Sequence, residues 1–166
     1  MRQFLLPVLA AGLTLAAASA VNAEIVHINP AKAFIARAVT VPAGSDTIYV
    51  SGITPQPADK AKPTELGDTK AQTISILGQI QDLLKEQGYT LSDIVMMRVF
   101  LAGDPAKGGK MDFAGMMEGY TQYFGALENK PARATVQVAA LVAPTMLAEI
   151  EVQAARTPMK PAAKKK

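Results

Sequence analysis

Few side chains in this sequence could carry out chemistry. Its 166 residues include no cysteine and a single histidine, His27. The lack of cysteine excludes disulfides, thiol nucleophiles and zinc–thiolate sites, and a lone histidine argues against a multi-histidine metal centre or a Ser-His-Asp triad. Any chemistry must therefore come from charged and polar side chains, and those of Arg133, Glu149 and Glu151 lie in regularly patterned segments.

These candidates lie in two segments that show the period-2 alternation of β-strands. In residues 133–140, one face carries Ala134, Val136, Val138 and Ala140, and the other carries Arg133, Thr135, Gln137 and Ala139. Residues 146–154 alternate likewise, with Glu149, Glu151 and Gln153 opposite Ala148, Ile150 and Val152. Each apolar face is predicted to lie under helices, and each polar face to meet water or another subunit, where an arginine and a carboxylate could meet across chains. The residues alone also allow an interface salt bridge at Arg133, and they do not choose between Glu149 and Glu151.

The rest of the chain predicts the elements that must position these side chains. Strands are expected at residues 25–28, 39–41, 47–51, 94–101, 133–140 and 146–154. The segments 39–41 and 47–51 are expected to form a hairpin. Apolar residues at helical spacing predict a helix over 69–87, capped by Asp68, and a second over 112–125. The order β-β-α-β-α-β-β predicts an α+β sandwich with two helices packed on one face of a mixed sheet.

The two ends of the chain differ from this body. Residues 1–23 have the layout of a signal peptide, with Arg2, an apolar stretch over 4–18 and small residues before position 24. The alternative is a membrane anchor, but the apolar stretch is shorter than the roughly 20 residues that span a bilayer. We expect cleavage after Ala23, no stable membrane span afterwards, and a periplasmic or secreted protein.

The basic charge of the sequence belongs mainly to its C-terminus. Residues 157–166 contain four lysines and two prolines without apolar periodicity, which predicts a disordered tail. Without Arg2 and these lysines, the body 24–156 has twelve Lys and Arg against fourteen Asp and Glu. It also lacks a basic face interleaved with aromatic residues, so nucleic-acid binding is not predicted.

Several segments together resemble one known family. They are YVSG at 49–52, GDTKAQ at 67–72, LSDIV at 91–95, YTQYF at 120–124, PARATV at 131–136 and EIE at 149–151. In this order and spacing they are similar to the YjgF-type Rid family, named for reactive intermediate deaminase activity. The resemblance extends over residues 24–156.

The resemblance implies a chorismate-mutase-like fold and a homotrimer with clefts between neighbouring subunits. It also implies hydrolysis of enamine and imine intermediates such as 2-aminoacrylate to 2-oxo acids and ammonia, without a cofactor or metal. The expected ligand is a small imino or enamino acid, or another small carboxylate. A non-catalytic trimer that binds small carboxylates, or acts like a chaperone, is the alternative function.

The resemblance also implies roles for particular residues. Arg133 matches the arginine that binds the substrate carboxylate, and its planar, permanently charged fork suits that task. Glu149 matches a glutamate that positions or activates the attacking water. Gly52 matches a turn that offers backbone contacts, and Tyr120 is expected to line the same cleft.

Ile53 stands where the family turn has a glutamine after Gly52, and two further positions depart from the family pattern. Phe34 stands in the segment where deaminating members carry a cleft tyrosine, and Met117 corresponds to an asparagine. The expected substrate cleft is therefore more apolar than that of the archetypal deaminase. These departures favour the binding function, whereas Arg133 and Glu149 favour the enzyme.

Overall fold

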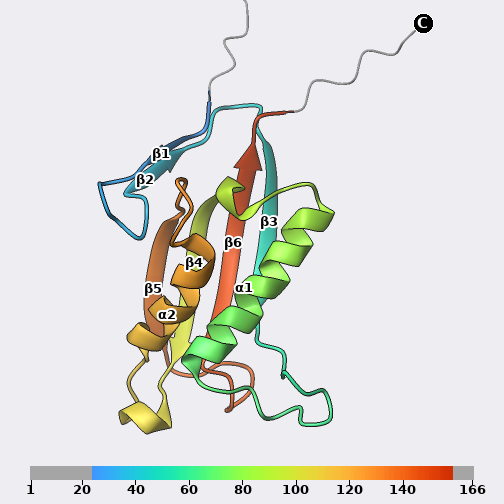
Figure 1. Ribbon diagram of the computed structural model, residues 1–166, viewed down its shortest axis with the longest axis vertical. Helices are drawn as coiled ribbons and strands as arrows, with labels where there is room; N and C mark the ends of the chain where they lie inside the picture. Colours follow the sequence, from blue (N-terminus) through green and yellow to red (C-terminus); the bar gives the residue numbers. More distant parts are fainter. Residues whose placement is uncertain (1–23, 159–166) are drawn as a thin grey trace, which may run out of the picture.

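A four-stranded sheet with two helices on one face forms the body of the protein (Figure 1). The computed structural model describes residues 24–158, so the predicted signal peptide and most of the predicted tail lie outside the described residues. The elements are β1 (Val26–Ile28), β2 (Ala38–Thr40), β3 (Asp46–Ile53), α1 (Thr69–Glu86), β4 (Ile94–Ala102), α2 (Phe113–Phe124), β5 (Ala132–Val138) and β6 (Ala148–Arg156). Two short 3-10 turns, Leu91–Asp93 and Pro105–Lys107, flank β4.

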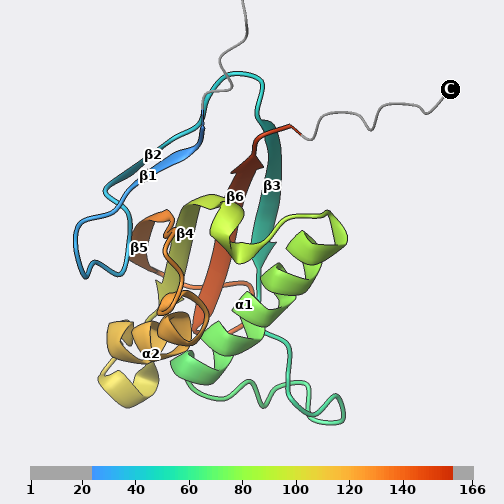
Figure 2. The same ribbon diagram turned by 45° about the horizontal axis from the view of Figure 1, so that its top comes forward.

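The sheet has the strand order β3-β6-β4-β5 and is mixed. Strands β4 and β5 are parallel, while β6 runs antiparallel to both β3 and β4. Helices α1 and α2 lie side by side over the same face of the sheet (Figures 1 and 2). The predicted fold class, an α+β sandwich with both helices on one face of a mixed sheet, is thus confirmed.

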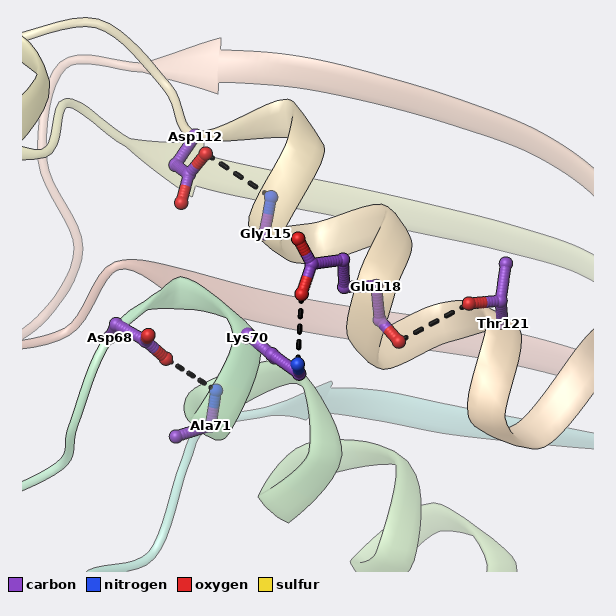
Figure 3. A network of polar contacts seen from close by, with 7 residues as sticks. All are labelled: Asp68, Lys70, Ala71, Asp112, Gly115, Glu118 and Thr121. Atoms are coloured by element: carbon purple, nitrogen blue, oxygen red, sulfur yellow. Dashed lines mark hydrogen bonds and ion pairs between the residues drawn. The ribbon is translucent and has the colours of Figure 1, made fainter.

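Both helices begin as their sequences predict. The Asp68 carboxylate accepts a hydrogen bond from the Ala71 backbone N–H at 2.8 Å, and the Asp112 carboxylate accepts one from Gly115 at 3.1 Å (Figure 3). The apolar stripe of α1 forms the core against the sheet, with Ile76, Leu77, Ile80 and Leu84 fully buried.

The two helices approach each other closely at Gly119 in α2. A Cβ atom at this position would lie 2.8 Å from the Cβ of Thr73 in α1, so a larger side chain would push the helices apart. Thr73 is itself fully buried, and its hydroxyl donates to the Thr69 carbonyl at 2.7 Å. This contact fixes the position of α2 over the edge of the sheet.

The predicted hairpin between residues 39–41 and 47–51 is wrong. Strand β2 pairs with β1, with Val26 opposite Thr40, and the pair forms a separate two-stranded sheet on the β5 side of the molecule (Figure 2). Strand β3 pairs instead with β6, where Val50 lies opposite Val152. The turn between β2 and β3 contains Pro42, which has no N–H for a ladder, so the chain changes direction there.

The predicted faces of residues 133–140 are reversed. Arg133 lies in register with Met97 of β4, which is fully buried under the helices, so Arg133 faces α2. Ala134 is opposite Arg98 on the other face, and Val136 is 47% exposed there. Because β5 is an edge strand, its helix-facing side chains border an opening beside α2 that can accommodate a guanidinium. The face of β6 that carries Glu149 and Glu151 points away from the helices, as predicted, since Ile150 and Val152 are buried.

Candidate functional site

Arg133 is the centre of the most developed site in the described structure. Its guanidinium lies over the ring of Tyr120, with Cζ 4.4 Å from the ring centroid, and it is 6.0 Å from that of Phe113. One terminal nitrogen, Nη2, donates to the thioether sulfur of Met117 at 3.2 Å. The other, Nη1, is buried and has no hydrogen-bond partner among residues 24–158. The guanidinium is therefore held by weak contacts and retains strong donors for an anion.

Burial destabilises the charged form of Arg133, and a bound anion would stabilise it. Burial lowers the pKa of Arg133 from its ordinary value, which means that the charged form is poorly solvated; Tyr120 opposes this shift. A carboxylate that accepts two parallel hydrogen bonds would restore the lost solvation. An unpaired buried donor of this kind points to a ligand.

An open pocket of about 600 Å³ lies over this guanidinium. Its walls come from the β1–β2 loop, from α2 and from β5, and they consist of Phe34, Ile35, Phe113, Ala114, Met117, Glu118, Thr121 and Arg133. We call this the Arg133 pocket. Most of its lining is apolar, so a bound carboxylate would be held in surroundings that strengthen its interaction with the arginine.

Tyr120 forms the floor beneath the guanidinium and ties two of these elements together. Its hydroxyl donates to the Phe34 carbonyl at 2.9 Å, which fixes the β1–β2 loop against α2. Burial raises the pKa of Tyr120 to about 12, against the opposing effect of the Arg133 charge. The phenol is therefore neutral at physiological pH and serves as a donor and a flat support.

The rim of the pocket carries two polar groups that already have partners. The Glu118 carboxylate lies 2.8 Å from the Lys70 ammonium of α1, and the Thr121 hydroxyl donates to the Glu118 carbonyl (Figure 3). The neighbouring Glu118 raises the pKa of Lys70. Both groups of the ion pair are exposed, so the pair positions the rim more than it stabilises the fold.

Glu149 and Gly52 lie together on the opposite face of the sheet. A Cβ atom at Gly52 would be 1.9 Å from Oε1 of Glu149, so the carboxylate rests directly on the glycine backbone. Within residues 24–158, Glu149 forms no ion pair or side-chain hydrogen bond. Its carboxylate remains available to accept from water or a ligand.

Glu151 shares this face but is engaged differently. It forms an ion pair with Arg98 of β4, which lies opposite it in the antiparallel register. Of the two glutamates, this pairing leaves Glu149 as the carboxylate without an ion-pair partner in the described residues. Arg98 was not predicted as a site residue; its position in the apolar segment 94–101 was the available signal.

The predicted site residues thus form two groups. The structure brings together Phe34, Met117 and Arg133 in the lining of one pocket, whereas Tyr120 is buried beneath the guanidinium and does not itself line it. Gly52 and Glu149 form a second group across the sheet. Sequence reasoning missed the rim residue Glu118 and the role of Phe113 as a wall. Phe113 lies four residues before Met117 in α2, and this helical spacing could have indicated a shared face.

Two further kinds of site are absent from residues 24–158. This part of the chain contains no cluster of three or more histidine or carboxylate side chains placed to hold a metal ion. None of its helices has the length and apolar character needed to cross a membrane.

These features define the class of protein: a small α+β chain of the chorismate-mutase-like fold that presents a half-buried arginine to an apolar pocket. The sequence model described as Endoribonuclease L-PSP matches residues 15–156. The chain therefore belongs to this family, the YjgF or Rid family, and the resemblance seen in the sequence is confirmed.

Individual relatives show how far the similarity extends. The 3-aminoacrylate deaminase RutC of Acinetobacter baylyi is 37% identical over 103 residues, which cover 62% of this chain and 74% of that protein. A RutC family protein of Pyrococcus horikoshii is 41% identical over 75 residues, which cover 45% of this chain and 53%, about half, of the relative.

Solved structures agree on the fold. A Rid-family protein of unknown function from Yersinia pestis has a TM-score of 0.63 at 25% identity, covering 80% of this chain and 99% of the other. A YjgF-family member from Mycobacterium tuberculosis has a TM-score of 0.52 at 27% identity with the same coverage.

Proposed function

We propose that the protein hydrolyses reactive enamine and imine intermediates to 2-oxo acids and ammonia. The observation that carries this proposal is the guanidinium of Arg133, which lines an apolar pocket and whose buried Nη1 has no hydrogen-bond partner in the described chain. A 2-imino acid presents a carboxylate that can accept hydrogen bonds from this guanidinium. The deaminase named among the relatives supports the same reaction class.

The proposed reaction requires little from the protein beyond positioning the substrate and a water molecule. Arg133 would hold the substrate carboxylate by two parallel hydrogen bonds, leaving the adjacent imine carbon at a fixed place. An enamine first takes a proton at carbon to become the imine. Water then adds across the C=N bond, and the resulting carbinolamine loses ammonia to leave the 2-oxo acid. A protonated imine is already electrophilic, so no covalent nucleophile is required.

Glu149 is the group we propose to orient and deprotonate that water. Its carboxylate rests on Gly52 and lacks an ion-pair partner in the described residues. Because it leaves the sheet on the face opposite Arg133, the two cannot act in one cleft of a single chain. We propose a homotrimer in which Arg133 of one chain and Glu149 of the partner subunit border a shared cleft.

The exposed face that carries Glu149 supports such an assembly. Tyr49 is 73% exposed and Val136 is 47% exposed on it, beside the Arg98–Glu151 ion pair. Apolar side chains next to an ion pair on an open sheet face suit burial against another copy. A monomer in solution would contradict the shared cleft.

We further propose that the mature protein acts outside the cytoplasm, after removal of residues 1–23. Its substrates would then be imines formed in the exported compartment, for example by oxidation of amino acids. N-terminal sequencing of the protein from a periplasmic fraction tests this, and a chain that begins at Glu24 is expected.

The decisive assay follows the decay of an imine generated in situ, such as 2-aminoacrylate or a longer 2-imino acid. Wild-type protein should accelerate the decay, and Arg133→Ala should abolish the acceleration. Arg37→Ala, which removes an exposed arginine on the β1–β2 loop, is the matched control and should behave as wild type. Decay that is equal with and without wild-type protein, for several side chains, would reject the deaminase function.

The alternative is a non-catalytic protein that binds small carboxylates. The apolar Phe34 and Met117 at the pocket favour it, since neither side chain offers a hydroxyl or amide to orient an imine. In that case stable 2-oxo acids should bind in an Arg133-dependent manner while imine decay stays unchanged.

A further inference from the structure

The Arg133 pocket is much larger than the smallest imino acids. A three-carbon acid occupies roughly 100 Å³, on the scale in which one water takes about 30 Å³, whereas the pocket measures about 600 Å³. A small acid bound to Arg133 would fill only part of this volume. The pocket of one chain can therefore hold an acid with a considerably larger side chain.

The walls around this space are apolar and poorly covered. The side chains of Phe34 and Phe113 are 53% and 44% exposed, although both are large and aromatic. They flank the pocket together with Met117, a flexible and polarisable side chain that adapts to apolar groups. Exposed apolar surface gathered around a concave site marks a surface that a ligand covers.

Among the described polar groups that line the pocket, the Arg133 guanidinium is the one available to bind a ligand. Met117 sulfur is only a weak acceptor for Nη2 of Arg133, so a carboxylate readily replaces it. At the rim, Glu118 is engaged by Lys70, and Thr121 donates to the Glu118 carbonyl. The guanidinium of Arg133 is thus the group that fixes a ligand, and within residues 24–158 no second cationic group lines the pocket.

The rim also disfavours a second negative charge on the ligand. The Glu118 carboxylate lines the same pocket as Arg133, and a side chain ending in a carboxylate would approach it. Two carboxylates within one pocket repel each other. Lys70 neutralises Glu118 only in part because both side chains are exposed. The pocket therefore suits monocarboxylates.

We propose that the Arg133 pocket selects 2-imino and 2-oxo monocarboxylic acids with a bulky aliphatic or aromatic side chain, and that Met117 and Phe34 set this preference. This specificity rests on the proposed function, which supplies the reacting carboxylate. In it, Arg133, stacked on Tyr120, holds the carboxylate while the side chain of the ligand covers the faces of Phe34 and Phe113.

Calorimetric titration of the full chain with stable 2-oxo acids tests the preference without any turnover. Phenylpyruvate and 4-methyl-2-oxopentanoate should bind at least tenfold more tightly than pyruvate, and 2-oxoglutarate should bind no better than pyruvate. Equal affinities for pyruvate and phenylpyruvate, or no measurable binding of any of these acids, would overturn the proposal.

Two variants test whether Met117 and Phe34 set the preference for bulky side chains. Met117→Asn and Phe34→Tyr should each reduce the ratio of phenylpyruvate to pyruvate affinity by threefold or more. Met146→Asn, which alters a half-buried methionine in the loop before β6, outside the Arg133 pocket, should leave the ratio unchanged. Phe34 is more than half exposed, so Phe34→Tyr remains informative if Met117→Asn does not fold. An unchanged ratio in Phe34→Tyr would refute the role of these walls.

The same acids separate this proposal from the proposed function. If the protein prefers bulky 2-oxo acids but does not accelerate imine decay, the specificity proposal is supported and the deaminase proposal is rejected. If it hydrolyses small and bulky imines at equal rates and binds small and bulky 2-oxo acids with equal affinity, the deaminase proposal is supported and the specificity proposal is rejected.

Discussion

Arg133 and Glu149 leave the same sheet from opposite faces. Arg133 is in register with the buried Met97 and lies over Tyr120, whereas Glu149 flanks the buried Ile150 and rests on Gly52 on the open face. The family resemblance assigns both residues to one reaction. In the proposed trimer that reaction draws the two residues from two chains.

Mixed oligomers offer the most direct test of this arrangement. Arg133→Ala and Glu149→Gln should each be inactive alone. When the two variants are unfolded together in equal amounts and refolded, about a quarter of the clefts should combine an intact arginine with an intact glutamate, because each cleft draws its two residues from different chains. Imine decay should therefore recover to about a quarter of the wild-type rate.

The control is each variant refolded by itself, which should regain nothing. Persistent inactivity of a mixture whose subunits demonstrably exchange would show that the two residues do not share a cleft.

Gly52→Ala should damage activity far more than stability. The added methyl group would lie 1.9 Å from Oε1 of Glu149, so the carboxylate must move away, and a flexible side chain can do so cheaply. The free energy of unfolding should change by less than about 1 kcal/mol, while kcat should fall by roughly tenfold or more because the water is mispositioned. Denaturant titration and imine decay measure the two effects. Ser51→Ala, at the exposed neighbouring position, should change neither.

Gln72→Leu should destabilise the fold strongly. The Gln72 side chain is fully buried; its amide nitrogen donates to the Gly67 and Thr145 carbonyls, and its oxygen accepts from the Leu147 N–H at 2.7 Å. Leucine fills a similar volume but leaves three partly buried backbone groups without their partner, which should cost about 1–3 kcal/mol in denaturant unfolding. Gln81→Leu, on the exposed side of α1, should stay within about 0.5 kcal/mol of wild type.

Tyr120 should make the protein sensitive to high pH. Since burial raises its pKa to about 12, the folded state keeps a proton that the unfolded state releases near pH 10. The stabilisation that this neutral phenol contributes is present below pH 10 and is lost as the pH rises toward 12, by up to about 2–3 kcal/mol.

Tyr120→Phe removes this titration and provides the comparison. At pH 8 the variant should be about 1 kcal/mol less stable, because it loses the hydrogen bond to Phe34, and the difference should shrink or reverse above pH 10. Melting curves of both proteins from pH 8 to 11.5 would record how this difference in stability changes with pH. Tyr49→Phe, at a ring that is 73% exposed, should run parallel to wild type; a parallel Tyr120→Phe curve would contradict the assignment.

Much of the architecture could be predicted from local pattern. The capped helices, the central apolar strand and the alternation of Glu149 and Glu151 depend on residues close in sequence, and all were predicted correctly. The pairing of β2 was predicted wrongly because adjacency along the chain suggested a hairpin. Whether β3 pairs with β2 or with β6 depends on contacts with strands about 100 residues away.

The sequence by itself determined the family, the two-layer class and the identity of the charged residues available for a site, because motif and periodicity are local properties of the chain. Only the tertiary structure decided which face of β5 carries Arg133. An edge strand with small residues on one side and polar residues on the other can turn either way, and the aromatic floor of Tyr120 together with the register to Met97 selects the helix side. That choice separates Arg133 from Glu149 and creates the apolar pocket.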